Sequence, residues 1–333
     1  MLDKSNLRQV NSSIFRKFFV NSTFIIHKSL TMMSQAQRAV PRPSAVVRAM
    51  CSTSSKGYSF ETLAMTSPRE NVYHVEMNRP DKLNAMNSTL WKDIGACFSQ
   101  LAVDPDCRAV VLSGSGRLFT SGLDMSDLGD MVGVVMSDDD VARKCRKLLA
   151  IIQEFQDSFT MIEKCPKPVI AAIHNACVGG GVDLICSVDI RYCTSDAWFQ
   201  VKEVDIGLAA DVGTLQRLPK IIGNESLVRE LAFSARKIFA SEAEKCGLVS
   251  RIFDNKESMM SGALDMAETI ASKSPVAVQN TKTSLIYARD HSVQEGLDYM
   301  KLLNMTMLQS EDLRIVAMAQ MSRDKKKPLF SHL

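Results

Sequence analysis

Three carboxylates with small or apolar neighbours are the residues of this chain best suited to proton transfer. Asp183 follows the triple glycine at residues 179–181, and Glu203 and Asp211 enclose a segment that contains Ile206 and Leu208. A carboxylate in apolar surroundings has a raised pKa and can serve as an acid or a base near neutral pH. Taken singly, Asp183 could equally compensate a helix dipole, and the other two could be solvated loop acids.

Two turns of small residues could present backbone N–H groups to a ligand. One is the triple glycine, and the other is Ser121-Gly122-Leu123-Asp124. Glycine lets a backbone approach a ligand closely. Neither turn is a phosphate loop, because no Lys-Ser/Thr follows and the Gly-x-Gly-x-x-Gly spacing is absent. Alone, the triple glycine could also be a packing site, and Asp124 could cap a helix or a turn.

The elements around these clusters alternate between strands and helices. Apolar runs predict strands at residues 72–77, 108–113, 168–173, 190–193 and 198–201. Helical periodicity predicts helices at residues 89–102, 141–163 and 182–187, and further helices from residue 224 onward. This order favours an α/β core at residues 58–255 followed by a helical region at residues 256–330.

The net charge of +3 averages two unlike parts. Residues 1–60 carry nine Lys or Arg and one acid, whereas the remainder carries 31 bases and 36 acids. An acidic body excludes a protein that tracks nucleic-acid phosphates. The basic leader at residues 1–57 is typical of a mitochondrial targeting segment or of a disordered extension, and Ser331-His332-Leu333 resembles a peroxisomal targeting tripeptide. We therefore expect the protein in the mitochondrion and the peroxisome.

Apolar runs and cysteines exclude two further classes. No apolar run reaches the roughly 18 residues of a membrane span, so no membrane insertion is expected. The nine cysteines are odd in number and lack the spacing of a zinc ribbon, which favours reduced thiols and no metal site.

Five motifs in a fixed order resemble the crotonase (enoyl-CoA hydratase/isomerase) superfamily. They are Asn78 to Met86, Ser121 to Asp124, Pro166 to Ile173, Gly179 to Asp183, and Gly213 to Pro219. The resemblance covers residues 58–330 and implies a ClpP-like spiral of ββα units with a C-terminal helical trimerisation region. It also implies an acyl-CoA thioester substrate, no cofactor and commonly a homohexamer built as a dimer of trimers.

The resemblance also implies roles for particular residues. The backbone N–H groups of Leu123 and Gly180 would form an oxyanion hole for the thioester carbonyl. The residues that it places against the substrate are Ser121, Gly122, Leu123, Asp124, Met125 and Gly180. The stretch from Asp81 to Ala85 would lie along the CoA nucleotide and pantetheine.

The placement of the acids distinguishes reactions within the superfamily. Its hydratases usually carry Glu at the position of Asp183 and Gly at that of Asp211, so simple hydration fits this chain poorly. Asp183, Glu203 and Asp211 together resemble the branch that converts 3,5-dienoyl-CoA into 2,4-dienoyl-CoA. That conversion removes a proton at C2 and adds one at C6, and two acids suit such a distant pair. We expect Asp211 to be the base at C2, Glu203 the acid at C6 and Asp183 to tune both, although the roles of the first two could be reversed.

Two other functions stay open at this point. A hydratase or a 3-to-2 monoenoyl-CoA isomerase would use the same superfamily scaffold. A non-catalytic binding protein of the same fold is the alternative from another class, although the acidic body and the three acids argue against one that binds RNA.

Overall fold

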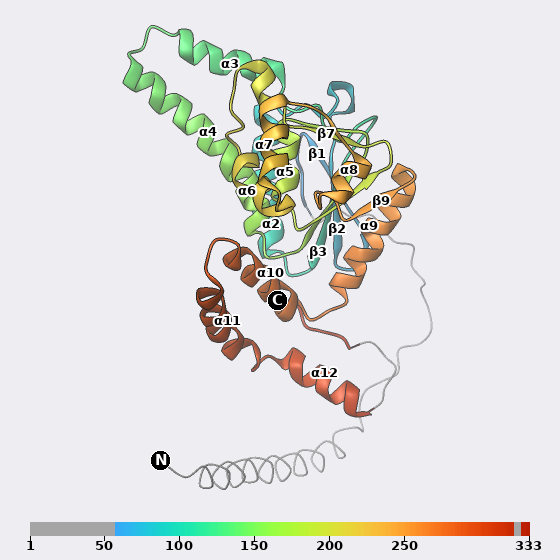
Figure 1. The fold of residues 1–333 in the computed structure, drawn as a ribbon. Helices are drawn as coiled ribbons and strands as arrows, with labels where there is room; N and C mark the ends of the chain where they lie inside the picture. Colours follow the sequence, from blue (N-terminus) through green and yellow to red (C-terminus); the bar gives the residue numbers. More distant parts are fainter. Residues whose placement is uncertain (1–56, 323–327) are drawn as a thin grey trace, which may run out of the picture. The chain divides into compact units, whose positions relative to one another are not determined.

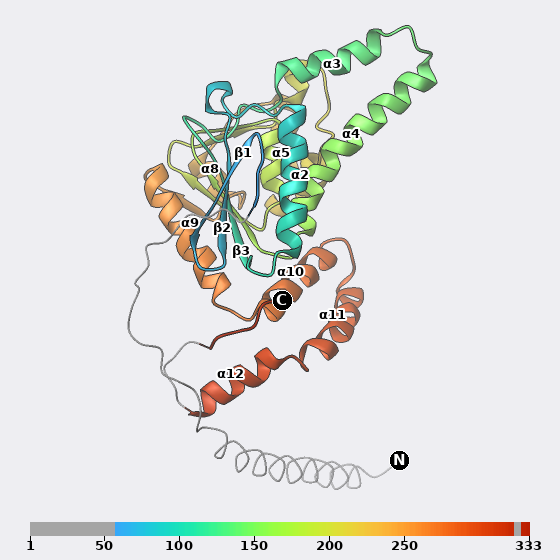
Figure 2. The same cartoon turned by 180° about the vertical axis from the view of Figure 1, so that it is seen from behind.

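A six-stranded sheet forms the centre of the protein, in the order β1-β2-β3-β4-β6-β9 (Figures 1 and 2). The computed structural model describes residues 57–322 and 328–333, so the predicted leader lies outside the described residues except for Gly57. β1 pairs antiparallel with β2, and the other neighbours are parallel. The strands are β1 (Leu63–Arg69), β2 (Val72–Met77), β3 (Ala109–Gly114), β4 (Val169–Ile173), β6 (Ile190–Thr194) and β9 (Arg251–Phe253).

Helices cover both faces of this sheet. Alternate residues of β3 point to opposite sides, with Val110 and Leu112 in one apolar cluster and Ala109 and Val111 in the other. The first cluster includes side chains of α2 (Ser88–Val103) and α4 (Val141–Lys164), and the second includes those of α9 (Lys256–Ala271). Because both faces are buried, the parallel strands are continuous apolar runs in the sequence.

A second, three-stranded sheet carries part of the site. It contains β5 (Ala176–Val178), β7 (Trp198–Gln200) and β8 (Ile238–Phe239), with β5 parallel to β7. The ends of two parallel strands meet at one edge, and the Gly179 N–H accordingly donates to the Gln200 carbonyl at 2.9 Å. This pairing places the triple glycine beside the segment that begins at Glu203.

The remaining helices complete the α/β architecture. They are α3 (Met125–Met136), α5 (Gly180–Cys186), α6 (Thr214–Ile222), α7 (Glu225–Ser234), α8 (Ala240–Lys245), α10 (Pro275–Ala288), α11 (Val293–Met307) and α12 (Glu311–Ser322), with short 3₁₀ helices at Pro80–Lys82 and Glu203–Ile206. The helical region expected from residue 256 begins with α9, which packs on the sheet. None of the helices in the described part of the chain has the length and hydropathy of a transmembrane span.

The predicted strands and helices are confirmed, and several further elements were missed. The five predicted strands correspond to β2, β3, β4, β6 and β7. The sequence did not reveal β5, β8 and β9, because runs of two or three residues show no period. It also missed β1, whose exposed residues alternate weakly, and α3, which contains Gly129 and Gly133.

Candidate active site

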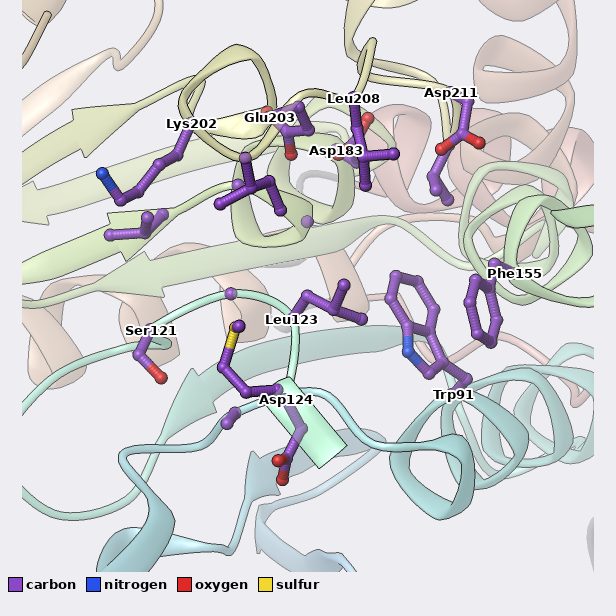
Figure 3. A pocket seen from close by; sticks show the side chains of 18 of the residues that line it. Trp91, Ser121, Leu123, Asp124, Phe155, Asp183, Lys202, Glu203, Leu208 and Asp211 are labelled. Carbon is purple, nitrogen blue, oxygen red and sulfur yellow. The ribbon is translucent and has the colours of Figure 1, made fainter. Parts of the chain in front are cut away.

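One cavity of about 440 Å³ collects all nine site residues expected from the sequence (Figure 3). The three acids lie along one side of it, opposite Leu123 and the turn that carries Ser121 and Asp124. Trp91 and Phe155 form the wall at one end. Residues as far apart in the sequence as Trp91 and Asp211 therefore face a single space.

The turn at Leu123 leaves one N–H free to face the cavity. Met86 donates to the Gly122 carbonyl at 2.8 Å, and Asp124 donates to the Met86 carbonyl at 3.0 Å. In such a parallel bridge the residue between the two contacts points its own N–H and carbonyl the other way. Leu123 is that residue, and no backbone acceptor for its N–H occurs in the described chain. Its N–H is suited to bind a substrate oxygen.

Gly180 supplies the matching N–H at the start of α5. The first N–H groups of a helix have no partner within the helix, and Gly179 before it adopts a left-handed φ of 52°. A Cβ on Gly180 would lie 3.3 Å from the Met86 sulfur and 3.4 Å from the Trp91 ring. The glycine therefore keeps the backbone close to the cavity wall.

The third glycine fixes how α5 approaches the turn. We expect Gly181→Ala to destabilise the fold and to lower activity, since its Cβ would lie 2.4 Å from the Thr120 methyl group. Overpacking of this kind typically costs about 1–3 kcal/mol of unfolding free energy. Gly133→Ala in α3 is the matched control, because nothing lies within 4 Å of its Cβ and it should stabilise by up to about 1 kcal/mol. Denaturant unfolding of both variants measures the difference, and equal stability would contradict it.

Asp183 lies in the first turn of α5 and is almost completely buried, with 1% of its surface exposed. The backbone N–H of Thr214, the first residue of α6, donates to its Oδ1 at 2.6 Å. Burial raises the pKa of Asp183 to about 6, against the opposing effect of this hydrogen bond. Asp183 is thus a carboxyl that can gain or lose a proton near neutral pH, and the loop after Asp211 holds it in place.

Glu203 begins the 3₁₀ helix that follows β7. Burial, together with the negative charge of Asp183, raises its pKa to about 7. Its Oε2 atom is buried and has no hydrogen-bond partner within the described chain. A Cβ on Gly179 would lie 3.1 Å from Oε1, so the missing side chain leaves room for this carboxyl. Glu203 is therefore suited to carry a proton that it can donate.

Asp211 lies in the loop before α6 and is more exposed than the other two acids. Burial raises its pKa as well, though its backbone hydrogen bond opposes the shift. The side-chain amide of Gln156 on α4 donates to the Asp211 carbonyl oxygen at 2.6 Å and anchors the loop. The three acids thus have different surroundings, and different environments divide acid from base roles.

The sequence gives no sign of the aromatic part of the cavity wall. Trp91 of α2 and Phe155 of α4 stack with ring centroids 4.5 Å apart. Both were on the apolar faces of expected helices, where a cavity residue cannot be told from a core residue. Further apolar side chains in the wall include Met131, Ile152, Val178, Ile206, Leu208 and Val212. An acyl chain fits such a lining.

Polar contacts below the turn hold the Leu123 segment in position. Arg79 forms an ion pair with Asp124 at 3.0 Å and also donates to the Ala85 carbonyl. The Thr120 hydroxyl donates to the Asn84 carbonyl at 2.7 Å. Asp124 also caps α3 through the Ser126 N–H, so its capping role is confirmed. The motif at residues 78–86 therefore supports the turn at Leu123 directly.

The mouth of the cavity carries two lysines. Lys82 and Lys202 line it together with Ala85, which lies in the stretch expected along the CoA moiety. Lys202 also pairs with Asp205 at 2.7 Å. In the described chain, no group of three or more His, Cys, Asp or Glu side chains is arranged to hold a metal ion.

Comparison with known proteins gives the same family from sequence and from structure. Residues 67–332 match the enoyl-CoA hydratase/isomerase family. The mouse mitochondrial delta(3,5)-delta(2,4)-dienoyl-CoA isomerase is 56% identical over 277 residues, which are 83% of this chain and 84% of that protein. The peroxisomal enzyme of that name from Arabidopsis thaliana is 44% identical over 83% of this chain and 99% of its own length.

Solved structures agree with this relationship. A putative enoyl-CoA hydratase from Streptomyces coelicolor superposes with a TM-score of 0.74 at 25% identity, over 85% of this chain and 99% of that one. An enoyl-CoA hydratase structure from Geobacillus kaustophilus gives a TM-score of 0.71 at 28% identity, over 82% of this chain and 98% of that one. The crotonase fold expected from the motifs is confirmed, and the chain belongs to the enoyl-CoA hydratase/isomerase family.

Proposed function

We propose that this protein isomerises 3,5-dienoyl-CoA to 2,4-dienoyl-CoA in the β-oxidation of fatty acids. The observation that carries the proposal is the presence of three carboxyls opposite two backbone N–H donors in one apolar cavity. The relatives from mouse and Arabidopsis thaliana that bear the name of this isomerase are 56% and 44% identical to the chain over 83% of its length.

The reaction follows from where each group faces the substrate. Leu123 and Gly180 hold the thioester oxygen through their N–H groups. Asp211 takes the proton from C2, which gives a dienolate whose negative charge spreads from the oxygen to C6. Glu203 then gives its proton to C6, so the double bonds end at C2 and C4. Each preorganised donor to the oxygen stabilises the transition state by about 3 kcal/mol.

Asp183 supports the division of roles between the base Asp211 and the acid Glu203 without contacting the reacting carbons. Its charge raises the pKa of Glu203 and so keeps the acid protonated. It also connects α5 to α6 through Thr214, and thereby links the Gly180 donor to the loop of Asp211. Asp183 is a positioning residue in this mechanism.

The pH profile of kcat/KM is expected to be bell-shaped. Glu203 must be protonated to act as an acid, so activity should fall about tenfold per unit once the pH rises above its pKa of about 7. Asp211 must be ionised to act as a base, so activity should also fall at low pH, below its raised pKa. Initial rates in buffers of constant ionic strength measure both limbs. A profile that stays flat from about pH 6 to about pH 9 would contradict the assignment of Glu203.

The direct test is incubation of the purified protein with 3,5-octadienoyl-CoA. The product has a 2,4-diene conjugated to the thioester, and its ultraviolet absorbance identifies the reaction. Turnover of a 2-enoyl-CoA with water, or of a 3-enoyl-CoA, would instead identify a hydratase or a monoenoyl-CoA isomerase. Binding of CoA esters without any turnover would identify the non-catalytic alternative.

The cellular location is proposed on two grounds. Relatives from mouse and from Arabidopsis thaliana are named as mitochondrial and peroxisomal, respectively. The sequence carries a basic leader and the tripeptide at residues 331–333. Within the described chain, Arg108 donates to the Phe330 carbonyl at 2.7 Å, and the His332 ring lies 3.0 Å from the Pro105 carbonyl. We propose that both organelles receive the protein.

A homohexamer is proposed from the superfamily and from the surface of α11. The exposed apolar side chains of this helix are Val293, Leu297, Leu302 and Met305, each at least 60% exposed. Exposed apolar residues gathered on one helix are typical of an interface. Size-exclusion chromatography with light scattering would give the mass of the assembly directly. A monomer of 36.8 kDa would contradict the proposal.

A further inference from the structure

A second cavity of about 360 Å³ lies next to Asp211, between α4 and α6. Asp211 and Val212 line both this rear cavity and the main cavity. The other two acids line the main cavity alone. Asp211 therefore belongs to the wall that the two spaces share.

The rear cavity has the polar lining that water requires. Glu163, one of its lining residues, pairs with Arg217 at 3.0 Å and with Arg289 at 2.5 Å, and Lys220 pairs with Asp290. Gln216 lies one helical turn before Lys220 and is exposed. Water bridges such polar groups readily, whereas the apolar main cavity suits the acyl chain.

The two-acid reaction leaves Asp211 and Glu203 in the wrong protonation states for the next turnover. After one forward turnover Asp211 holds the proton from C2, and Glu203 has lost its own to C6. The next turnover requires the reverse state, so a proton must leave Asp211 and another must reach Glu203. With acyl-CoA in the main cavity, the front of Asp211 is covered.

We propose that the rear cavity is a proton-exchange port, through which Asp211 passes the C2 proton to water while the ligand still occupies the main cavity. In this step the Asp211 O–H bond breaks and a water molecule takes the proton, with no change in oxidation state. The proposal rests on the proposed function, because it assigns a route to the proton that the isomerisation removes.

Deuterium exchange at C2 tests the route when Glu203 cannot complete the reaction. In Glu203→Gln the dienolate is not protonated at C6, so Asp211 can only return a hydrogen to C2. The charged dienolate stays in the oxyanion hole, and deuterium found at C2 must have reached Asp211 while the ligand was bound. Wild-type isomerisation is measured first, and its absence would refute the proposed function rather than the port.

The port is blocked by adding Gln216→Trp to Glu203→Gln, and the matched control adds Leu215→Trp. Leu215 is exposed on the same helix but lines neither cavity. We expect C2 exchange to slow by about tenfold or more with Gln216→Trp and to stay unchanged with Leu215→Trp. Lys220→Trp fills the same cavity from the next turn of α6 and should act in the same way.

Two further measurements make the result decisive. Gln216→Trp alone should bind the CoA ester normally and complete its first turnover within about threefold of the wild-type rate, because the groups that touch the substrate are intact. Unchanged C2 exchange in both blocked variants would overturn the proposal and indicate transfer inside the main cavity. A first turnover that slows as much as the exchange would also overturn it, since the cavity would then act by positioning Asp211.

Discussion

Asp211→Asn is expected to lower the rate of dienoyl isomerisation by about two to four orders of magnitude, the usual effect of removing a positioned general base. Asparagine keeps the size and shape of the side chain but cannot take the proton from C2. The backbone anchor from Gln156 to residue 211 does not involve the carboxylate, so the loop should keep its conformation. Stopped-flow absorbance of the conjugated product measures the effect.

Two controls separate chemistry from binding. The affinity for a CoA ester should survive in Asp211→Asn, because Lys202 lies at the other side of the cavity from Asp211 (Figure 3). Glu203→Gln should lower the rate of isomerisation by a comparable factor, yet it should keep exchange of the C2 proton with deuterated water. The opposite pattern, with exchange kept in Asp211→Asn and lost in Glu203→Gln, would reverse the two roles. Wild-type rates in both variants would show that neither acid carries the reaction.

Leu123→Pro is expected to reduce activity by about two to three orders of magnitude through the loss of one oxyanion donor. Proline has no N–H, while the two hydrogen bonds that hold this turn to Met86 use the Gly122 carbonyl and the Asp124 N–H. The substitution therefore removes the donor and leaves both of these contacts available. Steady-state kinetics with a dienoyl-CoA substrate measure the loss, which should fall mainly on kcat.

Leu123→Ala is the matched control for this prediction. It keeps the N–H and shortens only the side chain that lines the cavity, so most of the activity should remain. Unfolding curves show whether the proline variant is folded. A folded Leu123→Pro protein with full activity would refute the role of this N–H, and an equal loss in Leu123→Ala would assign the effect to the side chain.

The sequence predicted the site better than it predicted the walls around the site. Carboxylates are rare in apolar surroundings, so Asp183 and Glu203 stood out, and both line one cavity together with Gly179 and Gly180 of the triple glycine. Trp91 and Phe155 gave no such signal, because an aromatic residue on the apolar face of a helix looks the same whether it faces a core or a ligand.

Tertiary packing decided the features that local patterns could not give. The short strand β5 exists because it pairs with β7, and that pairing brings Gly179 to Glu203. The hydrogen bond from Thr214 to Asp183 joins residues that are 31 positions apart. No period or composition of either segment encodes such a contact, and the raised pKa of Asp183 follows from burial that only the fold provides.

The stacked pair in the cavity wall gives the protein an optical reporter of its own site. Trp91 is one of two tryptophans in the chain, and it lies with Phe155 where the acyl chain would bind. The other, Trp198, lies beneath the ammonium group of Lys237 and does not line this cavity. The fluorescence of Trp91 should therefore change when a ligand fills the cavity, whereas that of Trp198 should stay constant. A Trp198→Phe protein would report ligand binding from Trp91 alone.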